Sequence, residues 1–212
     1  MRVPLDPAGT PFIAGAAALT IPGWYGLGLA GAAVPGILAI LFIFFFRDPE
    51  RHPREDENPR AVFAPADGRV LVAGAAARDI APPGTWLQIS IFLSPLDVHV
   101  NRVPISGRIG RVDFRRGRKF PAYRPDAAAV NERSEVWIEH PNQQTVVVRQ
   151  IVGVLARRVV CRLQPGRQVR AGDRMGIMKF GSRMDVFLPT SAVLRVSVGD
   201  RVRGGETTLA TL

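Results

Sequence analysis

Hydrophobic residues run without interruption in the first quarter of the chain and occur in short runs in the rest. Residues 11–46 contain no charged side chain, and residues 37–46 are all apolar. A helix that is apolar on every side does not match the surface helix of a soluble domain. Pro22 and Gly23 divide the run, and its second part, residues 24–46, exceeds the about 20 residues that cross a bilayer. The pattern predicts an N-terminal hydrophobic helical hairpin.

The flanking residues favour a membrane. Trp24 and Tyr25 are of the aromatic types that gather at membrane interfaces, and Arg47 and Arg51 follow the run, as expected on the cytoplasmic side. We predict that residues 1–47 associate with the cytoplasmic face of the cell membrane, as a hairpin that enters and returns. A shallow monotopic anchor is one alternative, and a buried hairpin in a soluble protein is another.

The remaining sequence predicts a mainly β domain. A polar, proline-rich segment, residues 48–60, has the composition of a linker. Beyond it, short apolar runs bounded by glycine and proline predict β-strands. We expect strands over residues 61–65, 68–74, 85–93, 136–139, 145–152 and 193–198. One short helix is expected at residues 155–160. Many short strands predict a barrel or sandwich over residues 61–212.

Two segments of this region repeat the order glycine, valine, glycine and acidic residue. They are residues 164–173 and residues 198–206. The repeat resembles the hairpins of biotinyl/lipoyl-like hybrid barrels, in which glycine supplies a positive φ at tight turns. A chance recurrence of glycine-rich turns is the alternative.

The charge balance favours an anionic partner. The formal net charge is +10, yet residues 1–50 hold two basic and three acidic side chains, so the excess lies in residues 51–212. Such an excess suits nucleic acid, an anionic membrane surface or an acidic substrate. No nucleic-acid recognition motif is present, and the hydrophobic hairpin favours the membrane. The basic run at residues 115–119 is a candidate membrane-facing patch, with a solvated turn as its alternative.

Cysteine and histidine limit the metal and redox chemistry. Cys161 is the only cysteine, which excludes an internal disulfide. His52, His99 and His140 are scattered without the spacing of metal ligands, so we expect no metal. His52 and His140 adjoin prolines and are expected at the surface.

The dipeptide Gly181-Ser182 offers a reaction of the chain with itself. A serine hydroxyl can attack the carbonyl of the preceding residue, and a glycine there leaves that carbonyl unshielded. β-Elimination of the resulting ester cuts the chain and leaves a dehydroalanine, which hydrolyses to a pyruvoyl group. This ketone can form a Schiff base with an amine and accept electrons from a leaving carboxylate. Alone, the dipeptide indicates only a turn.

Several motifs accompany the dipeptide in a fixed order. They are Phe46-Arg47-Asp48-Pro49-Glu50-Arg51, Pro65-Ala66-Asp67-Gly68, residues 92–102 (FLSPLDVHVNR), Asn131-Glu132-Arg133, Ala156-Arg157-Arg158 and residues 180–189 (FGSRMDVFLP). With this ordered set, the chain resembles the short bacterial and archaeal form of phosphatidylserine decarboxylase proenzyme. The resemblance implies a lyase of phospholipid biosynthesis that converts phosphatidylserine into phosphatidylethanolamine and CO2.

The resemblance also implies how such an enzyme matures. The zymogen would cut itself between Gly181 and Ser182 into a β chain, residues 1–181, and an α chain, residues 182–212. Ser182 would become the covalent pyruvoyl cofactor. The two chains would remain a heterodimer, because residues 182–212 read as strands of the same barrel, and the heterodimer could assemble further.

Two residues are candidates for proton transfer and self-cleavage. The unshifted pKa of histidine lies near neutrality, so His99 is the candidate for proton transfer. Strand alternation would place Asp97, His99 and Asn101 on one face. Asp67 matches an acid assigned to self-cleavage in the longer bacterial form of the family, with an ordinary turn residue as the alternative.

The chain departs from that longer form at Arg102. The longer form carries a second histidine there, three residues after the position of His99, so a complete Asp-His-Ser relay does not carry over. Either His99 replaces the missing base, or strain and an oxyanion-type environment drive cleavage. Arg102 and Arg183 are candidates for the substrate phosphate or carboxylate, because a guanidinium binds such groups through paired hydrogen bonds.

Two other functions fit parts of the pattern. A membrane-tethered adaptor or carrier of biotinyl/lipoyl type would bear its modification on Lys179, and detection of that modification would identify it. A pyruvoyl decarboxylase of a soluble amino acid would not need the hydrophobic residues 11–46. It would turn over free serine or aspartate as well as the lipid.

Overall fold

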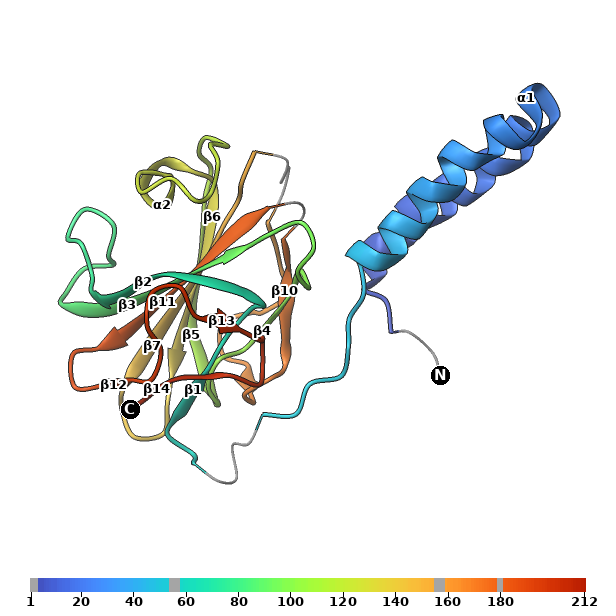
Figure 1. Cartoon of the computed structure of the whole chain (residues 1–212). Coiled ribbons are helices and arrows are strands. Elements are labelled where there is room, and N and C mark those ends of the chain that lie inside the picture. The colour runs from blue at the N-terminus through green and yellow to red at the C-terminus, as the bar shows by residue number, and fades with distance from the viewer. Residues whose placement is uncertain (1–3, 54–57, 155–158, 179–180) are drawn as a thin grey trace. The chain divides into compact units, whose positions relative to one another are not determined.

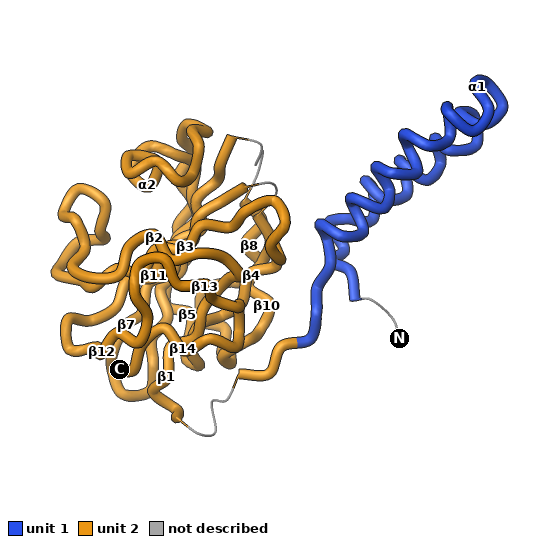
Figure 2. Tube along the Cα trace, viewed as in Figure 1, with its two compact units in different colours: residues 1–50 blue, residues 51–212 orange. Residues whose placement is uncertain are grey.

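The structure is a computed structural model that describes residues 4–53, 58–154, 159–178 and 181–212. The chain forms two compact units, residues 1–50 and residues 51–212, which Figure 2 draws in blue and orange. The first unit is helical, and the second consists mainly of strands (Figure 1).

The first unit is a helical hairpin, as predicted. A short 3-10 helix, η1 (Pro7–Gly9), leads into α1 (Thr10–Phe45), whose helical backbone is interrupted at Leu27 and Gly28. Figure 1 shows the two arms of α1 running side by side. Gly28 has a φ of 60°, a conformation that glycine adopts readily and that allows the chain to reverse.

The predicted position of the hairpin turn is wrong. Pro22 and Gly23 lie inside the first arm, and the reversal occurs at Gly28. Gly23 instead packs against the second arm: a Cβ built on Gly23 would lie 2.3 Å from the carbonyl oxygen of Gly31, and one on Gly31 would lie 2.2 Å from that of Gly23. The glycine that suggested a turn therefore allows close helix packing.

The two ends of the hairpin meet. The N–H of Asp6 donates a hydrogen bond of 2.9 Å to the carbonyl oxygen of Phe46, and the ring of Phe12 packs on the rings of Phe42 and Phe46. Residues 7–45 are long and apolar enough to cross a membrane, with a mean hydropathy of 2.4 in an 18-residue window. Most of their large apolar side chains are exposed, and an exposed apolar surface of this extent marks a site of interaction.

The described part of the second unit contains fourteen strands and one short helix. They are β1 (Ala61–Phe63), β2 (Gly68–Ala75), β3 (Trp86–Leu93), β4 (Val100–Arg102), β5 (Gly107–Arg115), α2 (Ala127–Val130), β6 (Arg133–Glu139), β7 (Thr145–Ile151), β8 (Val159–Cys161), β9 (Gln168–Val169), β10 (Arg174–Met178), β11 (Ser182–Pro189), β12 (Val193–Leu194), β13 (Arg201–Val202) and β14 (Thr208–Thr211). The predicted mainly β fold is confirmed.

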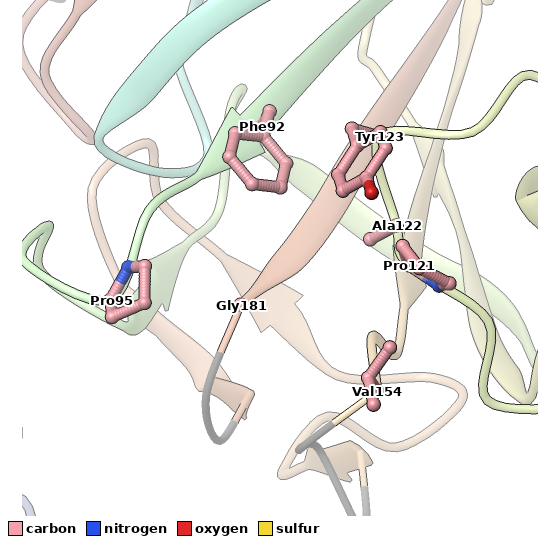
Figure 3. A pocket seen from close by; sticks show the side chains of 7 residues that line it. All are labelled: Phe92, Pro95, Pro121, Ala122, Tyr123, Val154 and Gly181. Atoms are coloured by element: carbon pink, nitrogen blue, oxygen red, sulfur yellow. The ribbon is translucent and has the colours of Figure 1, made fainter.

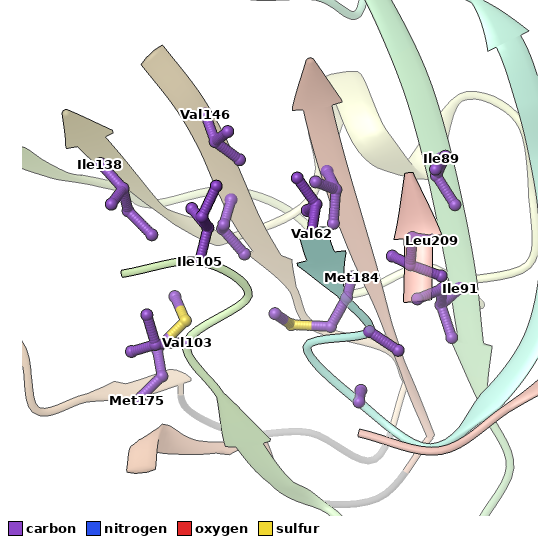
Figure 4. Packing of buried hydrophobic residues seen from close by; sticks show 14 of the residues in the cluster. Val62, Ile89, Ile91, Val103, Ile105, Ile138, Val146, Met175, Met184 and Leu209 are labelled. Carbon is purple, nitrogen blue, oxygen red and sulfur yellow. The ribbon is translucent and has the colours of Figure 1, made fainter. Parts of the chain in front are cut away.

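Three antiparallel sheets make up this unit. The largest has the order β13-β2-β3-β11-β7-β6-β5-β9, and the two others are β1-β14-β12 and β4-β10-β8. Along β11, Met184, Val186 and Leu188 alternate onto one face and enter the apolar core. The core also receives side chains from the two small sheets, such as Val62 and Met175 (Figure 4). The small sheets therefore cover the inner face of the large one.

The repeated glycine segments adopt the same conformation. Gly166 and Gly199 have φ values of 86° and 98°, and Gly172 and Gly205, each six residues further on, have values of 84° and 75°. Between the glycines lie β9 and β13, which pair with β5 and β2 respectively. Likewise β10 pairs with β4 as β14 pairs with β1. The unit thus contains an internal repeat, as a hybrid barrel of the predicted type requires.

Other predicted boundaries differ from the structure. The strand expected at residues 193–198 is limited to β12, and the strands β5, β9 and β10 were not predicted. The helix expected at residues 155–160 falls mostly outside the described residues, and its last two positions begin β8. In β5, charged side chains and a register shift between Ile109 and Arg111 interrupt the alternation on which prediction depends, and β9 is too short to show one.

Candidate active site

Ser182 begins β11, a strand near the middle of the large sheet. Its register partner on β3 is Leu93, and both residues are fully buried. Because side chains alternate along a strand, Ser182 faces the core on the same side as Met184. The Oγ of Ser182 has no hydrogen-bond partner among the described residues. Leaving a buried polar group unsatisfied costs about 1–3 kcal/mol, which favours a reactive role over a packing role.

Gly181 holds the backbone before Ser182 in a conformation that favours glycine. Its φ is 65°, in the left-handed region. A Cβ built on Gly181 would meet nothing within 4 Å, so conformation rather than space requires glycine here. The structure therefore joins a glycine in the left-handed region to a buried hydroxyl at the predicted cleavage site.

His99 lies just before β4 and is fully buried. Its Nδ1 lies 2.9 Å from the carbonyl oxygen of Asp97. The prediction that Asp97, His99 and Asn101 share one strand face is wrong for Asp97. That residue lies in a turn before the strand, and its carboxylate accepts the N–H of Ser94 at 2.8 Å. The carbonyl of Asp97, not its carboxylate, contacts the imidazole.

A buried amide pair lies on the same face of the large sheet as Ser182. The Nε2 of Gln150 donates a hydrogen bond of 2.8 Å to the Oδ1 of Asn101. Gln150 pairs with Met184 across β7 and β11, so its side chain faces the interior on the side of Ser182. In the described part of the chain, the Asn101 Nδ2 and the Gln150 Oε1 have no hydrogen-bond partner. Gln150 was not predicted as a site residue, although it stands out with Arg149 as a polar residue at the end of the apolar run of β7.

Asp67 lies at the bend between β1 and β2. Its carboxylate accepts hydrogen bonds from the Nη2 of Arg51, at 2.9 and 3.2 Å, and from the N–H of Gly204, at 2.7 Å. Asp67 directly precedes β2 and Ser182 begins β11, and the strand β3 lies between these two strands in the sheet. The contacts with Arg51 and Gly204 fix the bend in place.

The two candidate arginines are both buried and already bonded. The Nη1 of Arg102 donates to the carbonyl oxygen of Gly172 at 3.2 Å. Arg183 points to the face of β11 opposite Ser182, where its Nε lies 2.6 Å from the Oδ1 of Asp185. Its Nη2 donates to the Oγ of Ser90 at 2.9 Å. The charge of Arg183 is therefore balanced within the fold.

Two cavities open beside the cleavage site. The smaller, of about 150 Å³, is lined by Phe92, Pro95, Pro121, Ala122, Tyr123, Val154 and Gly181 (Figure 3). The larger, of about 320 Å³, includes Gln88 and Arg183 in its lining. Tyr123 lines both and packs edge-on against Phe92, with ring centroids 6.1 Å apart. The site thus offers an apolar cavity at Gly181 and, next to it, a mainly apolar cavity that contains the polar side chains of Gln88 and Arg183.

Cys161 is not a second nucleophile of this site. Burial raises the pKa of its thiol above the ordinary value, and a hydrogen bond with the backbone of Leu163 lowers the pKa by less. The thiol therefore stays protonated at neutral pH, whereas the thiolate is the reactive form.

Comparison with known proteins identifies the family. A family model described as phosphatidylserine decarboxylase matches residues 38–210. Among curated phosphatidylserine decarboxylase proenzymes, that of Desulfotalea psychrophila is 37% identical over 100% of this chain and 98% of its own length. That of Salinibacter ruber is 43% identical over 92% and 86%, and that of Mycobacterium bovis is 43% identical over 98% and 89%. The chain therefore belongs to the phosphatidylserine decarboxylase family.

Proposed function

We propose that this protein decarboxylates phosphatidylserine to phosphatidylethanolamine and CO2, after cutting itself between Gly181 and Ser182. The observation that carries the proposal is the buried hydroxyl of Ser182, which lacks a partner in the described structure and directly follows a glycine in the left-handed region. The name of the relatives, phosphatidylserine decarboxylase proenzyme, supports both the substrate and maturation from a precursor.

Self-cleavage would need no reactant except water. The Oγ of Ser182 bonds to the carbonyl carbon of Gly181, the C–N bond breaks and the hydroxyl proton moves to the amine, which gives an ester. Loss of the Cα proton of residue 182 then breaks the Cβ–O bond, so Gly181 leaves as a carboxylate and a dehydroalanine remains. Water converts that residue into a pyruvoyl group and ammonia. Residues 1–181 and 182–212 become separate chains.

The surroundings of Ser182 fit a pyruvoyl group. The position is buried, and the Asn101 Nδ2, which has no partner within the described ranges, is a donor that could serve a ketone oxygen. The group would supply an electron sink for the broken bond between the substrate Cα and its carboxylate. The apolar surroundings would keep water from the reacting carbon.

The protein's own residues would move one proton and assist cleavage. We assign proton transfer at the substrate Cα to His99, which is buried and oriented by its contact with the carbonyl of Asp97. We assign Asp67 to self-cleavage on the family resemblance, and its carboxylate is held by an ion pair with Arg51 at 2.9 Å.

The substrate would occupy the two cavities. The apolar cavity at Gly181 suits the glycerol and the first methylene groups of the lipid. Arg183 lines the adjoining cavity and is our candidate for the headgroup, with Arg102 as the second. Tyr123, which lines both cavities and is 62% exposed, would border the path of the lipid between them.

The hairpin would bind the protein to the cytoplasmic face of the cell membrane in a peripheral or monotopic manner. Its ends meet at Asp6 and Phe46, so the chain would enter and leave the bilayer on one side. The basic run 115–119 is fully exposed, and each basic residue near an anionic surface contributes about 1 kcal/mol.

The intact mass of the purified full chain tests this function. We expect wild-type protein to give two chains, one ending at Gly181 and one starting with a blocked residue 182. Phosphatidylserine should become trapped on the short chain by borohydride. Ser182→Ala should remain one inactive chain, whereas the control Ser191→Ala, at an exposed serine, should be cut normally. An uncut wild type, or a cut and active Ser182→Ala, would exclude the proposal, and modification of Lys179 would identify a carrier instead.

A further inference from the structure

We infer that Gly153 is a positioning residue for self-cleavage, because its backbone holds the carbonyl that Ser182 attacks. This inference rests on the proposed function and adds to it Gly153, which lies 28 positions before Gly181 along the chain. Gly153 follows β7, the strand that pairs with β11. The two glycines thus lie at neighbouring ends of two paired strands.

The contact between the two backbones is direct. A Cβ built on Gly153 would lie 1.9 Å from the carbonyl oxygen of Gly181 and 3.0 Å from its carbonyl carbon. The first distance is far too short for any real side chain and the second is at the lower limit, so only glycine leaves room for this carbonyl. The carbonyl oxygen of Gly181 therefore points toward the place that a Cβ of Gly153 would occupy, and a residue with a side chain would push it away from its present direction.

The segment that carries Gly153 is itself fixed. Asn131 is 1% exposed, and its Nδ2 donates hydrogen bonds of 2.8 Å to the carbonyl oxygens of Val152 and Phe120. The N–H of Val152 donates to the carbonyl oxygen of Glu132 at 3.1 Å. One side chain thus ties the residue before Gly153 to the segment that leads to Ala122. Figure 3 shows Ala122, Val154 and Gly181 around the same cavity.

Two glycines thus serve the scissile bond for different physical reasons. Gly181 needs its positive φ but has open space around the missing Cβ, whereas Gly153 needs space. The first sets the backbone angle at the bond, and the second sets the direction of the carbonyl. Attack by Oγ requires the carbonyl carbon within reach and its oxygen free to accept charge, and such alignment accounts for a large part of intramolecular rates. After cleavage this carbonyl belongs to a free carboxylate, so the role of Gly153 ends there.

The test is the rate of chain cleavage in full-length Gly153→Ala. We expect cleavage to slow by about 100-fold, the effect of misplacing a reacting group by about 1 Å. Turnover of phosphatidylserine per pyruvoyl group formed should stay at the wild-type value. Hydroxylamine, which cuts esters, should not restore chain separation, because the acyl shift itself is slowed. The matched control is Gly107→Ala, where a Cβ would meet the carbonyl oxygen of Glu139 at 2.4 Å away from the cleavage site; it should be cut at the wild-type rate despite a similar loss of thermal stability.

The outcomes separate this inference from the proposed function. If wild-type protein is uncut, the proposed function fails. If wild type is cut and Gly153→Ala is cut equally fast, only the role of Gly153 fails, and the same holds if hydroxylamine restores chain separation or if Gly107→Ala is slowed as much. Should Gly153→Ala not fold, Asn131→Ala decides, because it removes the anchor of Val152 without adding a side chain. Slow cleavage of a folded Asn131→Ala supports the inference, and cleavage at the wild-type rate overturns it.

Discussion

At the scale of single residues, equivalent positions in the two halves of the internal repeat can be compared. A polar side chain that is buried in one half only is a candidate for a chemical role, whereas side chains common to both halves serve the fold. Asn101 lies on β4 opposite Gly176 of β10, and the corresponding position on β1 is Val62, opposite Ala210 of β14. One half of the repeat thus buries a valine where the other buries an amide. A buried polar group with unmet hydrogen bonds costs stability, so its presence in one half of the repeat only, hydrogen-bonded to Gln150 of β7, favours a functional role.

His99 gives the first prediction at this scale. His99→Ala should slow cleavage, decarboxylation or both by about 100-fold, the lower range for loss of a general acid–base group. Cleavage is measured as the fraction of cut chain, and decarboxylation as CO2 release per pyruvoyl group. The control is His52→Ala, because His52 is exposed and should behave as wild type. Wild-type rates of both steps in His99→Ala would remove this residue from the site.

Asp67 gives the second prediction, and the equivalent position in the other half of the internal repeat indicates which substitution to make. Asp67 accepts the N–H of Gly204, and at the corresponding place in the other half the Oγ of Ser106 accepts the N–H of Ala171 at 2.9 Å. A serine can therefore replace the structural contact of the carboxylate. Asp67→Ser should fold and yet be cut about 100-fold more slowly, as expected when a general base is lost.

Thermal unfolding and mass measurement check this variant together. A folded Asp67→Ser that is cut at the wild-type rate would show that the carboxylate serves only the bend and the ion pair with Arg51. Ser106→Ala is the matched control, because it removes the corresponding hydrogen bond without touching the cleavage site.

Only the part of the candidate site that is contiguous in the chain could be predicted from the sequence. Gly181 and Ser182 adjoin in the chain, so a local motif identifies them. Gln150 lies on β7 and Gly153 follows that strand, both remote in sequence from Ser182, and their meeting with β11 depends on strand order and register. No local pattern carries that information. The prediction of Asp97 beside His99 failed for a related reason, because alternation was extended beyond the end of the strand.

At the scale of elements, segments with a continuous apolar pattern were predicted well, whereas β5, which is nine residues long but carries several charged side chains, was not. The hairpin, β3 and β7 agree with the expected runs to within a few residues, because their hydrophobic patterns extend over many positions. The turn of the hairpin was misplaced, because Pro22-Gly23 has the stronger turn composition, whereas only Gly28 adopts a positive φ. The contact between Gly23 and Gly31 requires Gly23 to lie inside the first arm, so the chain reverses at Gly28 instead. No pattern along the sequence reveals this contact.

The hairpin gives a prediction on membrane depth. Each arm of α1, on either side of Leu27 and Gly28, is about 25 Å long at 1.5 Å per residue, close to the about 30 Å of a bilayer core. Trp24 lies near the turn and is 55% exposed, so it should reach the opposite interface, where tryptophan is favoured. In full-length protein carrying Trp86→Phe and Trp137→Phe, lipids brominated near the headgroup should quench Trp24 more than lipids brominated at the chain ends. The reverse order would place Trp24 near the bilayer centre and would mean that the hairpin spans only one leaflet.

At the scale of the whole molecule, the proposed cut falls where the fold can tolerate it. Residues 182–212 contain β11, β12, β13 and β14, which belong to two of the three sheets. β11 pairs with β3 along eight residues and with β7 along five. The cut removes one covalent bond at the start of β11 and none of these pairings. The short chain is thus an interior part of the β unit rather than an appendage.

This arrangement predicts that the two chains remain together after cleavage. Met184, Val186 and Leu188 are completely buried, and burial of an apolar side chain of this size contributes about 1.5–3 kcal/mol each. The short chain would have to expose these side chains and break the pairings of β11 on both edges in order to leave. We expect cut protein in detergent to elute from gel filtration as one particle, at the volume of uncut Ser182→Ala, and to separate only in denaturant. The register of β11 with β3 and β7 argues that the short chain stays in the sheet. Loss of the short chain under native conditions would show that these pairings do not hold it there.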